Sequence, residues 1–478
     1  MDIQSFVGAR LRVANLKFDH YMGGMLLGDS CYWGANDITF LHGPETILMG
    51  NSAADFKEGF MYKKLILALL LCAAPAMAQT IAIRAGNLID PAKGTVSKDQ
   101  IIVVKDGKIA AVGAAVAIPK DAQVVDLSKE WVMPGLMDAH THVTFEEIPG
   151  KAPFEAMYLK QSTAYRALQG AHIGKVLLEA GITTMRDVGN EADYACEDLR
   201  KAIHQGWVEG PTLLCSGKII GPFGGQSKGM PEEVGGFWLH EYIDADTANE
   251  IRKAIHQNIY YGADLIKLAT DNSDYFYTED EIRAAADETH NAGRALAVHV
   301  YGGKAADNVI RGGADSVEHG FALTVDQLKL MKEKGTYLVG TDFPEAHLAG
   351  LNPSNDTLAD AKKLGDQIIA RLSNANKVGV KMAFGSDTVT AMPGRTRADM
   401  VFDYLAVWRA AGVSNADILK AMTANCADLL RVSKERGAIA EGQFGDIIAM
   451  PGDPLQEIES LRKVNFVMKN GKIVREAK

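Results

Sequence analysis

Cysteine is scarce in this sequence, and no two cysteines form a CxxC pair. Only Cys196, Cys215 and Cys426 lie beyond residue 79. This spacing excludes a zinc ribbon and a dithiol redox motif, since both require paired cysteines. We expect the three cysteines to be buried thiols. One disulfide among them is compatible with the sequence, but no pattern indicates it.

Runs of basic residues are also missing, and 60 aspartates and glutamates outnumber the 50 lysines and arginines, which gives a net charge of −10. Proteins that bind nucleic acids or other acidic polymers concentrate positive charge on one surface. The balance therefore argues against a nucleic-acid partner. Hydrophobic residues make up 47% of the 478 residues, which is enough for a large globular core.

The most apolar stretch, Leu65–Ala74, has only ten residues and is too short to span the ~30 Å hydrocarbon core of a bilayer. Two lysines precede it and Ala76-Met77-Ala78 follows it, and these are the parts of a secretory signal peptide. We predict a signal peptide at residues 61–78 and a periplasmic or secreted mature chain without a transmembrane span. Residues 1–60 are then expected to be a non-native upstream extension, with Met61 as the true start.

Short β-type runs separated by turns fill residues 79–133, and the same style returns at residues 437–478. Asp106-Gly107 and Asn470-Gly471 are typical hairpin dipeptides. Neither segment is long enough to form a stable core by itself. We predict that both ends of the mature chain combine into one small β-sandwich domain.

Between these ends, residues 134–436 alternate short apolar runs with helical stretches such as Glu279–Ala292 and Val325–Lys334. This alternation predicts an α/β fold, a (β/α)₈ TIM barrel, whose active site lies at the carboxyl ends of the strands. A doubly wound sheet is the alternative, but no glycine-rich dinucleotide-binding turn supports it. The eight predicted strands are Leu136–Val143, Ile182–Val188, Thr212–Ile219, Leu265–Ala269, Ala295–Val300, Ser316–His319, Tyr337–Thr341 and Met382–Asp387.

Histidines and an aspartate stand at the ends of several predicted strands. His140 and His142 are two residues apart on the first strand, so their side chains project to the same side and can bind one cation through nitrogen. His299 and His319 end the fifth and sixth strands, and Asp387 ends the eighth. Each residue alone could be structural, as a core histidine or a helix N-cap. Together at one barrel mouth they indicate a metal site.

Lys267 lies inside the apolar fourth strand, where an unpaired ammonium group is costly to bury. It could snorkel to solvent or form a buried ion pair. Alternatively, CO₂ converts its amine into a carbamate that bridges two metal ions. The histidines and the aspartate at the same barrel mouth favour the carbamate.

These motifs resemble the signatures of the amidohydrolase superfamily. The resemblance begins at Pro134-Gly135-Leu136-Met137-Asp138-Ala139-His140-Thr141-His142 and continues through Ile266-Lys267, His299-Val300-Tyr301-Gly302, Val317-Glu318-His319-Gly320 and Gly385-Ser386-Asp387. Within the superfamily, the chain is most similar to the Xaa-Pro dipeptidase-like (prolidase-type) enzymes, which are related to ochratoxin-cleaving amidases. The features that point there are the lysine of the fourth strand, the His-Val-Tyr-Gly sequence, and Met185-Arg186-Asp187-Val188-Gly189.

The resemblance implies two divalent metal ions, expected to be Zn²⁺, bridged by carboxylated Lys267 and a hydroxide. One ion would bind His140, His142 and Asp387, and the other ion would bind the remaining pair of histidines. The hydroxide would attack the substrate carbonyl while Asp387 shuttles the proton to the leaving amine. Tyr301 is the candidate for stabilising the oxyanion, although it could instead be a packed aromatic residue.

The expected substrates are Xaa-Pro dipeptides, hydrophobic C-terminal dipeptides or N-acyl amino acids, cleaved at a C–N bond by a dipeptidase or carboxypeptidase. Lys228 or Arg395 could bind the substrate carboxylate, or both could be solvated surface charges. Organophosphate, lactone or cyclic-amide hydrolysis remains an alternative within the superfamily. A non-catalytic binding protein on a decayed barrel is the alternative from another class. A homo-oligomer is compatible with the sequence.

Overall fold

The computed structural model describes residues 80–147, 159–189, 191–227, 231–271, 275–351 and 355–476. The predicted extension at residues 1–60, the predicted signal peptide at residues 61–78 and Lys228 lie outside these ranges. Within the described ranges, no helix combines the length and the apolar character needed to cross a bilayer.

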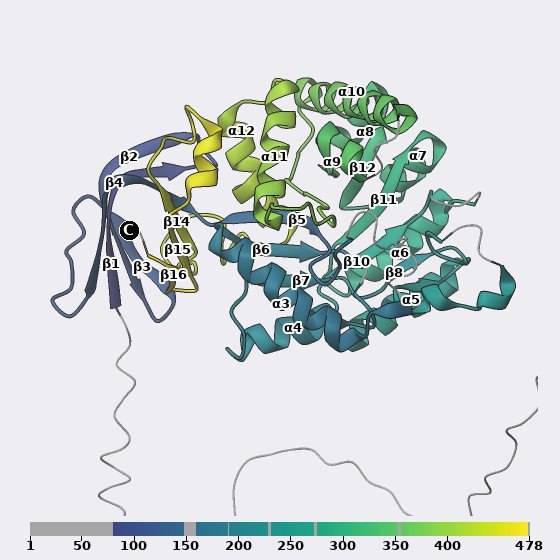
Figure 1. The fold of residues 1–478 in the computed structure, drawn as a ribbon, viewed down its shortest axis with the longest axis horizontal. Helices are drawn as coiled ribbons and strands as arrows, with labels where there is room; N and C mark the ends of the chain where they lie inside the picture. Colours follow the sequence, from purple (N-terminus) through teal and green to yellow (C-terminus); the bar gives the residue numbers. More distant parts are fainter. Residues whose placement is uncertain are drawn as a thin grey trace, which may run out of the picture. The chain divides into compact units, whose positions relative to one another are not determined.

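Strands from both ends of the described chain form one seven-stranded sheet (Figure 1). Its order is β16-β15-β14-β4-β1-β2-β3. The antiparallel pair β4 and β14, with Pro134 opposite Ile447, joins the two ends. The strands are β1 Thr80–Asp90, β2 Thr95–Lys105, β3 Lys108–Gly113, β4 Gln123–Pro134, β14 Ile447–Met450, β15 Phe466–Lys469 and β16 Lys472–Arg475.

Strand β14 is buried on both faces, as its continuous apolar sequence predicts. Ile447 and Ala449 belong to a small core within the seven-stranded sheet, whereas Ile448 and Met450 belong to the large core of the rest of the chain. Alternate side chains of one strand therefore pack into two different cores, because successive residues of a strand point to opposite sides.

The middle of the chain contains only parallel strand pairs within its two sheets. One sheet has the order β5-β6-β7 and the other the order β13-β12-β11-β10-β8-β9. The strands are β5 Leu136–Thr141, β6 Ile182–Asp187, β7 Thr212–Cys215, β8 Ile219–Gly221, β9 Tyr242–Asp244, β10 Ile266–Ala269, β11 Leu296–Gly302, β12 Ser316–Ala322 and β13 Tyr337–Val339.

Helices follow most of these strands and pack along them (Figure 1). The predicted helix Val325–Lys334 is confirmed, and Glu279–Ala292 is confirmed with its last residue as the C-cap. The helices are α3 Thr163–Glu179, α4 Ala195–His204, α5 Ala248–Tyr261, α6 Glu279–Asn291, α7 Gly303–Gly312, α8 Val325–Lys334, α9 Glu345–Leu351, α10 Asn355–Val378, α11 Arg397–Ala410, α12 Asn415–Lys420 and α13 Cys426–Leu429.

Two of the eight predicted strands differ from the structure. Thr212–Ile219 is not one strand, because the chain leaves β7 at residue 216, turns through Gly217 with φ of +69° and enters β8 in the other sheet. Met382–Asp387 forms no ladder, although Met382 makes an isolated bridge with Leu338 of β13. Hydrogen bonds from Ala139 N to Phe384 O (2.8 Å) and from Asp387 N to His140 O (2.7 Å) attach this segment to β5.

A disulfide joins Cys196 in α4 to Cys215 in β7, with 6.0 Å between the Cα atoms. The expectation of three buried thiols is therefore wrong for these two residues and confirmed for Cys426. The pair forms because α4 packs against β7, a tertiary contact that cysteine spacing alone does not reveal.

We predict that replacing Cys196 and Cys215 with serine lowers the free energy of unfolding by about 3 kcal/mol. The disulfide joins residues separated by 19 positions, and closing a loop of this size restricts the unfolded chain. Urea denaturation measures the loss. Wild-type protein denatured in reductant is the matched control and should show the same loss. If a peptide that contains Cys196 separates without reductant from the peptide that contains Cys215, the pairing is contradicted.

Candidate active site

His140 in β5 and His142 just after it point their Nε2 atoms at one carboxylate. These atoms lie 3.7 Å (His140) and 3.2 Å (His142) from Oδ1 of Asp387. The Nδ1 atom of His140 bonds to Oε2 of Glu318 (2.6 Å), and that of His142 bonds to the carbonyl of Gly189 (2.7 Å). A carboxylate and a carbonyl only accept hydrogen bonds, so both Nδ1 atoms donate. Each ring is therefore held by a hydrogen bond at Nδ1, and its Nε2 atom faces Asp387.

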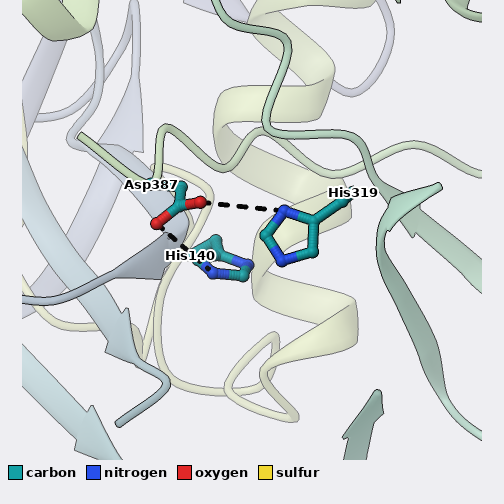
Figure 2. Close-up of side chains that lie close together, drawn as sticks. All are labelled: His140, His319 and Asp387. Carbon is teal, nitrogen blue, oxygen red and sulfur yellow. Dashed lines mark ion pairs between the residues drawn. The ribbon is translucent and has the colours of Figure 1, made fainter. Parts of the chain in front are cut away.

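His319 completes a compact group with His140 and Asp387, and Figure 2 marks an ion pair from the carboxylate of Asp387 to each of the two rings. One ligand atom from each of the three residues lies within 4.8 Å of the others. The Nδ1 atom of His319 is 3.7 Å from Oδ2 of Asp387 and 2.8 Å from Oγ1 of Thr341. This spacing is compatible with a single cation bound by all three side chains.

Left-handed backbone conformations direct two of these side chains into the site. His319 has φ of +68° and Asp387 has φ of +50°, values that non-glycine residues seldom adopt. Consecutive residues of a regular strand point to opposite faces. At His319 the backbone departs from that geometry, so Glu318 and His319 both reach the ring of His140. Such strained residues often occur at functional sites, where the surrounding structure holds them.

Lys267 and His299 stand on neighbouring parallel strands, β10 and β11. The imidazole ring of His299 lies 4.3 Å from that of His319, centroid to centroid. Burial lowers the pKa of Lys267 to about 8, although the charges of Glu318 and Asp387 oppose the shift. Burial therefore increases the share of uncharged amine at neutral pH to roughly a tenth, and the uncharged form is the one that reacts with CO₂.

The electrostatics of the group suit metal binding. Burial lowers the pKa of His140 to about 4, and it also lowers the pKa values of His299 and His319. Burial raises the pKa of Asp387, but the nearby His140 and His142 outweigh it and keep the carboxyl group ionised. The neutral imidazole nitrogens of His140, His299 and His319 next to a carboxylate are donors that Zn²⁺ prefers, so these residues fit a divalent metal ion.

The sequence analysis did not assign a role to Glu318 or Arg186. Glu318 is fully buried, and its Oε1 atom accepts a hydrogen bond from Nη2 of Arg186 (2.7 Å). Burial raises the pKa of Glu318. The charge of Arg186 and the hydrogen bond with His140 lower it by a larger amount, so the pKa lies below its usual range and the carboxylate stays ionised. No sequence pattern marks the pair, because the two residues are 132 positions apart in the chain and meet only in the folded structure.

Asp138 also has a supporting role that the sequence analysis missed. Its Oδ1 atom accepts hydrogen bonds from the backbone N–H groups of His140 (3.1 Å) and Ser386 (3.0 Å). Burial raises its pKa to about 6, despite these hydrogen bonds. The side chain thus ties the end of β5 to the segment that carries Asp387. Gly385 allows this close approach, since a Cβ atom there would lie 2.7 Å from Cβ of His140.

Tyr301 lies beside the histidines, with its ring 4.7 Å from that of His299 and 37% of the residue exposed. It stacks on Phe321, with 5.4 Å between the ring centroids. Arg395 is held by Asp403, with Nη1–Oδ2 and Nη2–Oδ1 distances of 2.6 and 2.9 Å. The Nε2 atom of Gln226 is 3.5 Å from Nε2 of His299.

Comparisons with known proteins identify similar structures and sequences. Similar solved structures include a Xaa-Pro dipeptidase with bound methionine, 27% identical with a TM-score of 0.73, covering 83% of this chain and 100% of that one. They also include A. niger ochratoxinase, 26% identical with a TM-score of 0.72, covering 84% and 96%. An uncharacterized protein of Mycobacterium tuberculosis is 25% identical over 356 residues, which are 72% of this chain and 85% of the relative.

The model of the amidohydrolase family matches residues 131–474, well over half of the sequence. The matched segment contains all six residues that the sequence analysis assigned as metal ligands. Because the match spans this length, the chain belongs to the amidohydrolase family.

Proposed function

We propose that this chain is an exported, dinuclear metal-dependent amidohydrolase that cleaves an amide or peptide bond. The observation that carries the proposal is the convergence of His140, His319 and Asp387 from three separate segments, with ligand atoms within 4.8 Å of one another. Similarity to a Xaa-Pro dipeptidase and to ochratoxinase supports a C–N bond as the target. The substrates are Xaa-Pro dipeptides, hydrophobic C-terminal dipeptides or N-acyl amino acids. Export rests on the pattern of residues 61–78 alone.

The proposed scaffold is a (β/α)₈ barrel over residues 134–436, with a β-sandwich domain made from residues 79–133 and 437–478. Segment 382–387 would supply the eighth strand of the barrel. Its hydrogen bonds support this assignment, since Ala139 N bonds to Phe384 O on one side and Ala383 N bonds to Leu338 O (3.1 Å) on the other.

Lys267, carboxylated on its amine, would bridge two divalent ions, expected to be Zn²⁺. His140, His142 and Asp387 would hold one ion, and His299 with His319 would hold the other. The lowered pKa of the buried Lys267 supports the carbamate. When bound, the ions supply polarisation of the scissile carbonyl and activation of water near neutral pH.

The remaining chemistry belongs to side chains of this protein. Asp387 accepts the proton of the attacking water and returns it to the leaving amine, first as general base and then as general acid. Tyr301, beside His299, donates its hydroxyl proton to the oxyanion that develops on the carbonyl. Lys228 or Arg395 binds the substrate carboxylate, and Arg395 must exchange its partner Asp403 to do so.

A substrate panel tests the proposed function. Purified mature enzyme, loaded with zinc, is assayed against Xaa-Pro dipeptides, dipeptides with hydrophobic C-terminal residues, N-acyl amino acids, lactones and phosphotriesters. We expect hydrolysis of one of the first three classes. Activity confined to lactones or phosphotriesters would overturn the proposal.

We predict that Asp387→Asn keeps both metal ions but lowers kcat by several orders of magnitude, because general acid–base catalysis contributes about 10²–10⁴-fold. Steady-state kinetics and elemental analysis on the same preparation measure both properties. The exposed Asp326→Asn in α8 is the control and should behave as wild type. Near wild-type turnover in Asp387→Asn would remove the proton-shuttle role.

Lys267→Ala should bind one metal ion where the wild type binds two, because the bridging carbamate is lost. Elemental analysis gives the metal content, and the mass of the intact protein reveals CO₂ on the wild-type lysine. Lys329→Ala, at an exposed position of α8, is the matched control. A single ion in fully loaded wild-type enzyme would contradict the dinuclear assignment.

Glu318→Gln should weaken zinc affinity by about 10–100-fold, because it removes the carboxylate that orients His140 and raises the basicity of its ring. Competition with a chelating dye measures the affinity. Glu279→Gln, at an exposed position in the first turn of α6, should leave it unchanged. Equal zinc affinity in Glu318→Gln and wild type would show that this contact does not support metal binding.

A further inference from the structure

A cavity of about 630 Å³ is lined by the segment that leads from α4 into β7 and by the C-terminal strands β15 and β16. We refer to it as the β16 cavity. Its volume is in the range of sites that bind small molecules, roughly 300–1,000 Å³. Much of its lining is apolar and includes Val208, Pro211, Leu213, Ile473 and Val474.

The β16 cavity is separate from the histidine site. Thr212, the first residue of β7, lines the cavity, whereas His140 stands near the carboxyl end of β5. Because β5, β6 and β7 are parallel, these two residues lie at opposite ends of the same sheet. A ligand in the cavity is therefore not a substrate at the histidines.

Two buried cations line this cavity and share one carboxylate. Arg436 and Lys469 are each 6% exposed. Nζ of Lys469 lies 3.0 Å from both carboxylate oxygens of Asp446, and Nη1 of Arg436 donates to Oδ2 of the same residue. Burial lowers the pKa of Lys469 to about 8, and the charge of Arg436 adds to this shift while Asp446 opposes it. Two positive charges thus face one negative charge, and an unbalanced buried charge is costly.

The other charged residues of the lining do not supply the missing negative charge. Glu209 is the only acid among the described residues that line the cavity, and it pairs with Nζ of Lys175 (2.9 Å). Arg200 pairs with Asp264. Lys472 is exposed and adds a further positive charge. The lining as a whole therefore favours an anion.

One edge of the Arg436 guanidinium group has an unused donor. The hydrogen bonds of Arg436 to Asp446 and to Oδ1 of Asn470 (3.2 Å) both come from Nη1. Within the described part of the chain, no acceptor reaches its buried Nε atom. Nε and Nη2 form the edge to which a carboxylate binds through two parallel N–H···O bonds. This unpartnered donor is a sign of a ligand that does not depend on the count of charges.

We propose that the β16 cavity binds a small organic carboxylate with an apolar body. The carboxylate accepts hydrogen bonds from Arg436 and balances the charge that Asp446 leaves uncompensated. The apolar body packs against the lining, where Leu213 and Ile473 lie, and removes its surface from water. Inorganic phosphate fits less well, because it has no apolar part to cover that lining.

Octanoate is the probe, and its binding is measured by isothermal titration calorimetry on the whole mature enzyme with its zinc site loaded. We expect one octanoate per chain. Octanamide has the same apolar body without the charge, and phosphate has charge without the apolar body. Each should bind at least tenfold more weakly than octanoate.

Two variants locate the bound octanoate. Lys469→Met removes the uncompensated charge and leaves Arg436 paired with Asp446, so it should weaken octanoate binding at least tenfold while zinc content stays unchanged. Val208→Trp places a large side chain in the cavity without altering any charge and should weaken binding to the same extent. Lys329→Met, at an exposed position of α8, is the matched control and should bind octanoate as the wild type does.

Three results would overturn the inference: no octanoate binding to the wild type, equal affinity for octanamide, or unchanged octanoate binding in both variants, which would place the ligand elsewhere, such as at the zinc site. Phosphate that binds more tightly than octanoate would overturn the class of ligand. If Lys469→Met does not fold, Val208→Trp decides the location. None of these results depends on which substrate the enzyme cleaves.

Discussion

Glu318 carries a negative charge in the interior, and the arrangement of the histidine site depends on how that charge is compensated. Arg186 in β6 supplies the opposite charge, and it also donates hydrogen bonds to the carbonyl of Ala139 and to Ser316. The Nδ1 atom of His140 donates a hydrogen bond to the other carboxylate oxygen. One buried ion pair therefore connects β5, β6 and β12 and fixes the ring plane of His140. Buried pairs of this kind contribute more to a unique geometry than to net stability, because both ions lose their hydration.

Backbone geometry provides the second constraint on the site. The site brings three histidines and an aspartate within a few ångströms of one another. Regular strands would not direct all of these side chains to one point. The left-handed residues His319 and Asp387 and the close approach at Gly385 solve this problem at the strand ends. At these two residues the unfavourable backbone conformation contributes to the placement of the side chains that face one another in the site.

Much of the framework was predictable because it depends on local patterns. The hairpins at Asp106-Gly107 and Asn470-Gly471 follow from left-handed turn residues, and helices α6 and α8 follow from their capping boxes and apolar spacing. The histidines of the site were predictable because they are polar residues at the ends of predicted strands, and the ends of parallel strands meet on one side of a sheet. Other contacts between segments far apart in the chain were not predictable. The disulfide, the break between β7 and β8, and the bond of Glu318 to Arg186 each depend on tertiary neighbours that no local pattern encodes.

The seven-stranded sheet has a consequence for how the chain reaches its final state. Strand β4 borders β1 on one side and β14 on the other, so its second edge stays open until residues 447–450 have been synthesised. All the histidines of the site precede that point. A chain cut short before β14 would carry every predicted ligand and still expose an unpaired edge, the kind of surface that promotes aggregation and attracts chaperones or proteases. Only a chain that includes β14 can give β4 its second neighbour, and β4 leads directly into β5, which carries His140.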